Sequence, residues 1–442
     1  MQGNNLSKIS RGIFNFFGKT VEKLDEEAKF VRRDSKLTAQ LFVKTLVLGC
    51  LSNPEITLEG MCQFLKEKGV SITKQGLDQR FNSQATILME NLLSNALKKF
   101  KTEKIPVIDL LKPFSSVKIQ DSSAVSLPDS LKEIYMGFGG SSSEAGLKIQ
   151  VMFDYLEGQI ESITVTDGRK NDQGFNDYLS KIEKGALYLQ DLGYFNLESL
   201  KTIQDSGAYF ISRYLNQTLM QDKKGTSIDL LKLLKKSGSH ISKDIRLGKN
   251  GNVEIRLVGQ RVPKEVYLKR IREINKKAKK NGCKTQPLTR ELAKWSIFVT
   301  NVPKSILNDK QVYLVYSLRW QIELFFKLCK SEVGIDKISS KNSNRVRCEF
   351  FAKLINITML LYMCFPVRWS NDQEISFRKA YKLLRMYILD FLKALSSIYN
   401  MVKFLEKFIG SLKKIALKDK GRPKRLATHQ KLMKVTGQEV LG

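Results

Sequence analysis

The sequence YSLRWQIELFFKLCK occupies residues 316–330 and combines an apolar helical pattern with four regularly spaced polar side chains. At about 100° per residue, Tyr316, Arg319, Glu323 and Lys330 fall within a wedge of roughly 60° on one helical face. A second stripe, about a quarter-turn away, is apolar enough to face a core and consists of Val315, Leu318, Ile322, Phe325, Phe326 and Cys329. The polar stripe is therefore expected at the edge of that core. There, a carboxylate among cations suits a site for phosphates and a divalent metal.

The same spacing also has an ordinary explanation. Arg319 with Glu323, and Glu323 with Lys327, are pairs of opposite charge four residues apart, which commonly decorate solvent-exposed helices. The helix considered alone leaves both interpretations open, so the rest of the chain has to decide between them.

The composition points to a nucleic-acid-binding protein. The chain of 442 residues carries 75 Lys and Arg against 44 Asp and Glu, a formal net charge of +31. Such an excess implies a polyanionic partner or an anionic membrane surface. The longest apolar stretch, 354–367, is interrupted by Asn356 and Thr358 and is shorter than the roughly 20 residues that a bilayer requires. No signal-peptide pattern opens the chain, so we expect a cytoplasmic, nucleoid-associated protein.

Cysteine and histidine offer little chemistry. The six cysteines form no CxxC pair and are expected to be reduced core residues. His240 and His429 both lie in polar, basic segments, so a zinc site or a Ser-His-Asp triad is poorly supported. Catalysis, where present, must rest on carboxylates, with a metal ion as the expected help.

Residues 1–110 are predicted to be a helical region, with helices at 37–51, 57–68, 73–81 and 85–100. The second and third have the proportions of a helix-turn-helix, with Gly69 ending one helix and Ser71 or Thr73 capping the next. Short helix pairs of this kind more often serve only to pack helices together. DNA recognition is therefore the less favoured of the two interpretations of this region.

The central part predicts an α/β fold, a ribonuclease H-like mixed sheet flanked by helices. Strands are expected at 117–120, 147–154, 161–166, 186–190, 208–213 and 295–300, with a hairpin turn at 157–159 and helices at 172–183 and 197–206. This pattern divides the core into 111–213 and 295–345, around a lysine-rich insertion at 214–294 with helices at 228–236 and 262–280. Residues 346–442 are expected to be helical with a basic tail.

Two aspartates follow predicted strands directly, Asp121 after the first and Asp191 after the fourth. In a three-two-one-four-five sheet order, strands one and four are neighbours, so both carboxylates would emerge side by side. The Glu323 helix, packed across that edge, would add a third carboxylate. Close carboxylates repel one another unless cations intervene, and a pair of Mg²⁺ ions would satisfy them. Each aspartate alone is more often a turn or cap residue, but their joint placement favours a phosphoryl-transfer site.

With these residues in place, the chain resembles bacterial insertion-sequence transposases of the DDE type that carry a Y-R-E-K signature. The resemblance covers roughly residues 115–360 and rests on three motifs: Asp121 with Ser122, Asp191 with Gly193 and Tyr194, and the set Tyr316, Arg319, Glu323 and Lys330. It implies that Asp121, Asp191 and Glu323 bind Mg²⁺, with Mn²⁺ able to substitute, and are catalytic. It also implies that Tyr316, Arg319 and Lys330 hold DNA phosphates, and that a homodimer joins transposon ends and target DNA by cut-and-paste transposition.

Two more residues are candidate DNA contacts. In the family that the chain resembles, a tryptophan placed like Trp295 stacks on a flipped base, whereas the alternative is a core anchor of its strand. Arg213, at the end of the fifth predicted strand, is a further candidate phosphate contact. The better-known insertions of the family are largely β-structured, so the predicted helices here weaken the case for a hairpin mechanism. Residues 421–425, GRPKR, resemble a minor-groove hook, though short basic runs are more often phosphate clamps.

Two other functions stay open from the sequence. One is a catalytically silent DNA-binding regulator derived from a transposase, and the other is a ribonuclease H-like nuclease that cuts without joining. The joint presence of the three acids and the four-residue signature favours the transposase.

Overall fold

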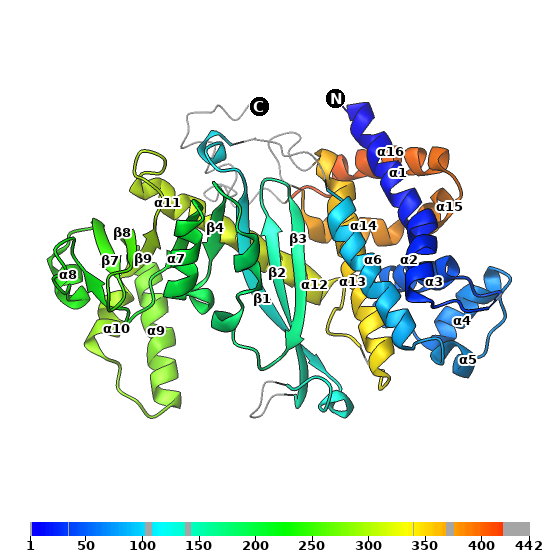
Figure 1. The fold of residues 1–442 in the computed structure, drawn as a ribbon, viewed down its shortest axis with the longest axis horizontal. Helices are drawn as coiled ribbons and strands as arrows, with labels where there is room; N and C mark the ends of the chain where they lie inside the picture. The colour runs from blue at the N-terminus through cyan, green and yellow to red at the C-terminus, as the bar shows by residue number, and fades with distance from the viewer. Residues whose placement is uncertain are drawn as a thin grey trace.

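The computed structural model describes residues 2–33, 35–101, 108–137, 143–338, 340–367 and 375–418. One sheet occupies the middle of an elongated molecule, with a helical bundle at one end and the insertion at the other (Figure 1). The basic motif at 421–425 lies outside the described residues.

The first five strands form the predicted core. Strand β1 pairs antiparallel with β2, and β2 with β3, while β1–β4 and β4–β5 are parallel. The resulting order, β3-β2-β1-β4-β5, is that of a ribonuclease H-like sheet, so the predicted fold class is confirmed. These strands are β1 (Val117–Leu127), β2 (Ala145–Asp154), β3 (Gln159–Asp167), β4 (Leu187–Gln190) and β5 (Tyr209–Arg213).

The insertion continues the same sheet. Strand β9 (Trp295–Thr300) pairs antiparallel with β5, and β8 (Val253–Arg261), β7 (His240–Leu247) and β6 (Met220–Gln221) follow it outward. The predicted helices are present as α8 (Leu230–Lys236) and α9 (Lys264–Lys280), but β6, β7 and β8 were not predicted. In β7, polar residues occupy the exposed positions and weaken the apolar signal, which survives only as Ile241, Ile245 and Leu247 on the buried face.

The predicted helix at 172–183 is wrong. Two short 3₁₀ helices, η4 (Asp172–Gly174) and η5 (Asp177–Lys181), replace it. The Asn171 side chain accepts a hydrogen bond from the Gln173 N–H (3.3 Å), and Phe175 has extended backbone angles (φ −87°, ψ 94°) that end the first turn. A side-chain hydrogen bond of this local kind competes with α-helix formation. Helix α7 (Leu197–Asp205) then leads to β5.

The N-terminal region contains the four predicted helices, preceded by three more that were not individually predicted. Between α4 and α5, Gly69 has φ +80°, which a glycine adopts without strain, and the Thr73 hydroxyl accepts from the Gly76 N–H (3.1 Å) as an N-cap. The elements are α1 (Gln2–Asn15), the π-helical turn η1 (Phe16–Thr20), α2 (Val21–Ala28), α3 (Ala39–Ser52), α4 (Leu58–Glu67), α5 (Lys74–Asp78) and α6 (Ser83–Lys99).

The C-terminal helices complete this bundle. Helix α13 (Ser343–Cys364) packs against α3, α6 and α14 (Phe377–Met386), while α15 (Ile388–Ala394) and α16 (Ile398–Ile415) close the outer end beside α1 (Figure 1). Residues 343–367 form a helix long and apolar enough to cross a membrane, but 94% of its most apolar 18-residue window is buried inside the protein. Burial in the centre of the bundle therefore accounts for the composition of α13.

Two hydrophobic cores meet at the sheet. The first core extends from the bundle to side chains of β1 and β2. The second core joins side chains of β4 and β5 to α7 and the insertion strands. No disulfide joins the six cysteines, which all lie in described parts of the chain. Cys50, Cys329, Cys348 and Cys364 are buried as predicted, whereas Cys62 is half-buried and Cys283 is exposed.

A buried lysine connects α13 to the turn that precedes it. The Lys353 side chain is fully buried, and its Nζ donates to the carbonyl oxygens of Gly334 and Lys337, each at 2.8 Å. The Gly334 carbonyl oxygen also accepts from the Lys337 N–H (2.9 Å), so the Lys353 ammonium group adds a second donor to a closed turn and holds that turn against the bundle.

We expect Lys353→Met to destabilise the protein by about 1–3 kcal/mol, because the Gly334 and Lys337 carbonyl oxygens lose a charged donor, although Gly334 keeps the Lys337 N–H. Denaturant unfolding would measure the change. Lys341→Met, at an exposed lysine before the same helix, should alter the free energy of unfolding by less than about 0.5 kcal/mol. Equal stability of the two variants would contradict this assignment.

Candidate active site

The parallel pairing of β1 with β4 brings two of the predicted carboxylates together. Gln120 is opposite Gln190 in this register, and the Gln190 side chain donates to the Gln120 carbonyl oxygen Oε1 (2.8 Å). Asp121 and Asp191 directly follow Gln120 and Gln190 in the sequence. Asp191 follows β4 as predicted, but Asp121 lies within β1, because β1 continues to Leu127 against β2.

The helix predicted to carry the polar stripe is divided into three parts. Helix α11 (Asp309–Tyr316) is followed by the 3₁₀ turn η7 (Ser317–Arg319) and by α12 (Trp320–Ser331). The backbone stays in the right-handed helical region at Tyr316, Arg319 and Trp320, so no extended residue separates the three parts there. Turn η7 lies against both β1 and β4, which places its side chains beside the two aspartates.

Arg319 is the residue that connects the carboxylates. Its Nη1 lies 3.3 Å from Asp121 Oδ2, and its Nη2 donates to Glu323 Oε1. The Tyr316 hydroxyl donates toward the Gln190 carbonyl oxygen (3.2 Å) and Asp191 Oδ1 (3.4 Å). The Arg319–Glu323 ion pair is thus formed. Because only 15% of the Arg319 side chain is exposed, however, it is not one of the solvent-exposed pairs that commonly decorate helix surfaces.

Lys330 does not join this group. Its side chain is exposed, and no ion pair to it is found within the described part of the chain. Arg213 is also exposed, at the end of β5, and its charge lowers the pKa of Tyr316, which burial and Asp191 raise. The structure therefore brings together five of the predicted site residues, namely Asp121, Asp191, Tyr316, Arg319 and Glu323. Arg213 lies near this group, and Lys330 lies apart from it.

The charge balance of the site is set by burial. Burial is the main cause that raises the pKa of Asp121 from 3.8 to about 6, and the nearby charges of Asp191 and Glu323 act in the same direction. The Ser122 N–H, 2.8 Å from Asp121 Oδ1, and the Arg319 guanidinium oppose this shift. Burial lowers the pKa of Arg319, but Tyr316, Asp191 and Glu323 outweigh it, so the pKa is raised and Arg319 stays charged.

The donor set fits a hard divalent cation. Carboxylate oxygens are the ligands that Mg²⁺ and Mn²⁺ prefer, and a cation would relieve the repulsion that contributes to the raised pKa of Asp121. Within the described ranges, no three acidic, His or Cys side chains are already arranged to hold a metal. The Arg319 guanidinium bridges Asp121 and Glu323 instead and supplies the positive charge there.

Trp295 lies in a different setting from the other candidates. Its side chain is 2% exposed within the second core, and the Arg261 guanidinium carbon lies 5.2 Å from the centre of its ring. This is the position of a core anchor. Base stacking by Trp295 would require the ring to become exposed, and it stays a prediction.

Sequence reasoning missed the polar residues behind the aspartates. Gln120 and Gln190 are buried and join β1 to β4, and the signal for them was the repeated Gln-Asp pair at 120–121 and 190–191. Asp172, which accepts a hydrogen bond from Ser122, was missed because it fell within the incorrectly predicted helix.

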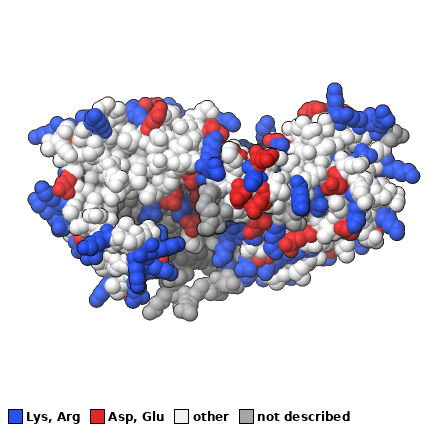
Figure 2. All heavy atoms as spheres, turned by 90° about the horizontal axis from the view of Figure 1, so that it is seen from below, with Lys and Arg blue, Asp and Glu red and all other residues white. Residues whose placement is uncertain are grey.

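Seen from below, the molecule has a central recess in which acidic side chains are visible, and Lys and Arg gather on the lobe beside it (Figure 2). That lobe corresponds in position to the insertion with α9, whose 17 residues include eight Lys or Arg and none that is buried. Basic side chains thus flank the approach to the recess, as a site for a polyanion requires.

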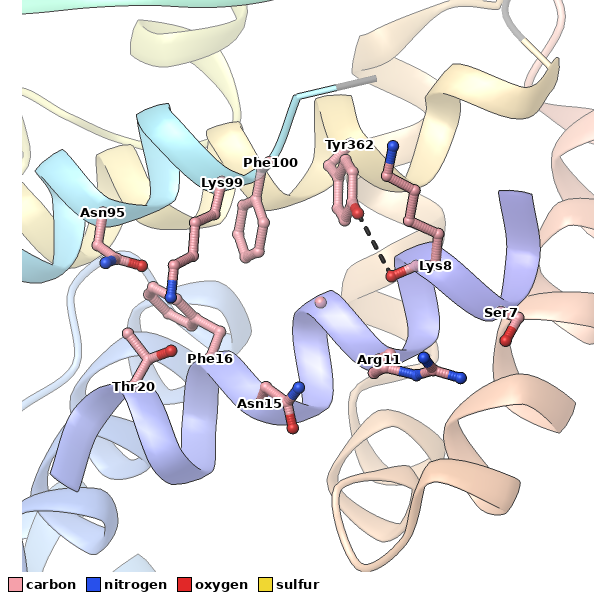
Figure 3. Close-up of a pocket in the computed structure, with 11 residues that line it drawn as sticks. Ser7, Lys8, Arg11, Asn15, Phe16, Thr20, Asn95, Lys99, Phe100 and Tyr362 are labelled. Atoms are coloured by element: carbon pink, nitrogen blue, oxygen red, sulfur yellow. Dashed lines mark hydrogen bonds between the residues drawn. The ribbon is translucent and has the colours of Figure 1, made fainter. Parts of the chain in front are cut away.

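A separate cavity of about 400 Å³ lies between α1, η1, α6 and α13 (Figure 3). It is lined by the basic residues Lys8, Arg11 and Lys99 and by an aromatic wall that includes Phe100 and Tyr362. Because it contains no carboxylate, it does not offer the chemistry that the carboxylate site offers.

In metal-free protein, stability should fall as the pH rises from about 4 to about 6. Asp121 binds a proton in the folded state up to a pKa of about 6, whereas the unfolded carboxyl loses it near 3.9, so the folded state holds more protons in this window. Asp121→Asn should remove this part of the pH dependence, as measured by unfolding in the presence of a chelator. Identical pH profiles for both proteins would contradict the prediction.

Comparison with known proteins identifies the family of the chain. The model of the family described as "Transposase DDE domain" matches residues 112–359. The chain is 27% identical over 411 residues to the transposase for insertion sequence element IS231F of Bacillus thuringiensis subsp. israelensis, covering 87% of this chain and 86% of that protein. It is also 27% identical to the transposase for insertion sequence element IS1151 of Clostridium perfringens, with 98% of each chain covered.

A solved piggyBac transposase synaptic complex with hairpin DNA aligns with 95% of this chain and 88% of that chain, at 12% identity and a TM-score of 0.47. The family match alone spans more than half of the sequence and includes every carboxylate described above. The chain therefore belongs to the DDE transposase family and is a DNA transposase of the insertion-sequence type.

Proposed function

We propose that this transposase works by cut and paste, with Asp121, Asp191 and Glu323 as its catalytic, metal-binding carboxylates. The observation that carries this proposal is that acids from β1 and α12 share the Arg319 guanidinium, while the acid at the end of β4 accepts from the neighbouring Tyr316 hydroxyl. Three acids that come from distant segments and repel one another suit a phosphoryl-transfer site, in which metal ions hold such a set together.

Each side chain then has a role. The carboxylates would hold Mg²⁺, with Mn²⁺ able to substitute, and such ions when bound activate water and stabilise a leaving oxygen. The Ser122 N–H holds one oxygen of Asp121, and the Tyr316 hydroxyl orients Asp191. Arg319 balances the carboxylate charge in the metal-free state and would offer its guanidinium fork to a DNA phosphate.

The proposed cut-and-paste reaction includes two kinds of phosphoryl transfer. In the first, a water oxygen bonds to phosphorus at the transposon end and the bond to the 3′ oxygen breaks, leaving a 3′ hydroxyl and a 5′ phosphate. In the second, that 3′ hydroxyl bonds to a target phosphorus and displaces another 3′ oxygen. Catalysis in both steps rests on positioning and charge stabilisation.

The wider partners follow from the charge and the fold. Lys330, Arg213 and Arg319 would contact phosphates of double-stranded DNA, and Trp295 would contact a base only after leaving its core position. We infer a division into the N-terminal region 1–110, the core 111–213 and 295–345, the insertion 214–294 and the C-terminal region 346–442. Two ends must be joined, so a homodimeric synaptic complex is expected, in a cytoplasmic, nucleoid-associated protein.

Replacing Asp121 or Asp191 by Asn, or Glu323 by Gln, should reduce strand cleavage on the order of 10²–10³-fold or more while DNA binding persists. The reason is that each change keeps the shape of the side chain but removes a metal-binding charge. The assay needs purified protein, Mg²⁺ or Mn²⁺, a labelled transposon end and a target plasmid.

The matched control is Glu265→Gln on the exposed face of α9, which should cleave normally. Normal cleavage by Asp191→Asn would contradict the assignment of the carboxylates. Binding without cleavage by the unmodified protein would indicate a silent regulator, and cleavage without joining would indicate a nuclease.

Arg319→Ala should lower the stability of metal-free protein by about 1–3 kcal/mol, because Asp121 and Glu323 lose their shared donor. A divalent metal should restore the stability but neither end-complex assembly nor cleavage, since an ion cannot replace a guanidinium fork on a phosphate. Thermal unfolding and gel-shift titrations would measure both effects. Normal assembly by Arg319→Ala would show that Arg319 serves the carboxylates only.

A further inference from the structure

A hydrogen-bonded network lies directly behind the two aspartates. Asp172, the first residue of η4, accepts three donors on its Oδ1: the Ser122 hydroxyl (2.9 Å), the Gln150 amide nitrogen (2.9 Å) and the Lys148 ammonium (3.3 Å). These donors come from β1 and from β2. Asp172 therefore joins the loop after β3 to two strands of the core.

The network continues to the turn that follows β4. The Tyr194 hydroxyl donates to Gln150 Oε1, and the two side chains are 3% and 2% exposed. Tyr194 belongs to η6 (Leu192–Tyr194), the 3₁₀ turn that Asp191 begins as N-cap residue. Its own N–H donates to the Asp191 carbonyl oxygen at 3.0 Å.

Each end of the network reaches a proposed catalytic residue. At one end, the Ser122 N–H donates to Asp121 Oδ1 (2.8 Å) while the Ser122 hydroxyl donates to Asp172. At the other end, Tyr194 fixes the turn that carries Asp191. Asp172 also lies against this turn directly, because a Cβ added at Gly193 would be 3.6 Å from Asp172 Oδ2.

We propose that Asp172 is a positioning residue, which fixes Asp121 and Asp191 relative to each other through Ser122 on one side and Gln150 with Tyr194 on the other. This inference rests on the proposed assignment of Asp121 and Asp191 as metal-binding carboxylates. Without the Asp172 acceptor, the buried Gln150 amide loses a partner and is free to turn, which releases Tyr194.

The geometry separates positioning from a direct role. Oδ1 of Asp172 is occupied by three donors, and Lys148 already balances its charge. The network then requires from Asp172 only an acceptor oxygen at the position of Oδ1. An asparagine supplies the same oxygen without the charge, so Asp172→Asn and Asp172→Ala distinguish an acceptor from a charge.

The test measures the Mn²⁺ concentration at the midpoint of the metal-induced rise in melting temperature, on DNA-free full-length protein, together with cleavage of a labelled end. Asp172→Ala should raise the Mn²⁺ midpoint and lower cleavage, each by about 10–100-fold, as the loss of an outer-shell partner typically does. Asp172→Asn should restore most of both. Ser122→Ala combined with Asp172→Ala should cost little more than Asp172→Ala alone, because the Ser122 hydroxyl acts through its contact with Asp172.

The control is Asp167→Ala, at an exposed acid at the end of β3, which should leave the Mn²⁺ midpoint unchanged. Equal loss in Asp172→Asn and Asp172→Ala would overturn the proposal in favour of a direct use of the charge. A lower melting temperature with an unchanged midpoint would reduce Asp172 to a structural residue. Both results are distinct from failure of the carboxylate assignment, which would appear as normal cleavage by Asp191→Asn.

Discussion

The register of β1 against β4 is the constraint on which the site depends. Gln120 and Gln190 are 1% and 0% exposed and bond to each other across the parallel pair, so the register is fixed by a buried contact as well as by the ladder. In a strand, a slip of one residue turns every side chain to the opposite face. Asp121 would then point away from Asp191, and no movement of α12 could reassemble the three carboxylates.

The change from α-helix to 3₁₀ turn at η7 explains which members of the polar stripe reach this site. Side chains three residues apart eclipse in a 3₁₀ turn, so Tyr316 and Arg319 are aligned, with the guanidinium carbon 6.0 Å from the centre of the Tyr316 ring. Tyr316 meets Asp191 and Arg319 meets Asp121. Lys330 shares their face, but it lies about 10 Å along the helix axis beyond Glu323, which is too far to join them.

The sequence was sufficient where local pattern and tertiary need agree. The five core strands, β9 and the neighbouring positions of the aspartates all follow from apolar runs bounded by turns. Prediction failed where long-range pairing overrides local preference. Strand β1 extends through Asp121, Ser122 and Ser123, residues that disfavour strands, because β2 supplies partners as far as Leu127.

The residues around the carboxylates show the same limit. The acids and Arg319 were identified because their chemistry is distinctive and their spacing is regular. Gln150, Tyr194 and Asp172 come from three segments, and only the folded sheet brings them together behind Asp121. No local spacing encodes such a contact, whereas the Gln-Asp repeat at 120–121 and 190–191 was visible in the sequence.

The insertion is tied to the catalytic core by more than the continuation of the sheet. Arg256 of β8 is 6% exposed, and its guanidinium donates to Asp309 Oδ1 (2.8 Å) and to the carbonyl oxygens of Leu307 (2.6 Å) and Val302 (3.2 Å). Asp309 is the first residue of α11, the helix that leads to Tyr316 and Arg319. An insertion strand therefore holds the start of the segment that positions two of the site residues. Because buried charge-assisted hydrogen bonds resist displacement, a movement of β8 would be passed to the start of α11 and so to the geometry of the site.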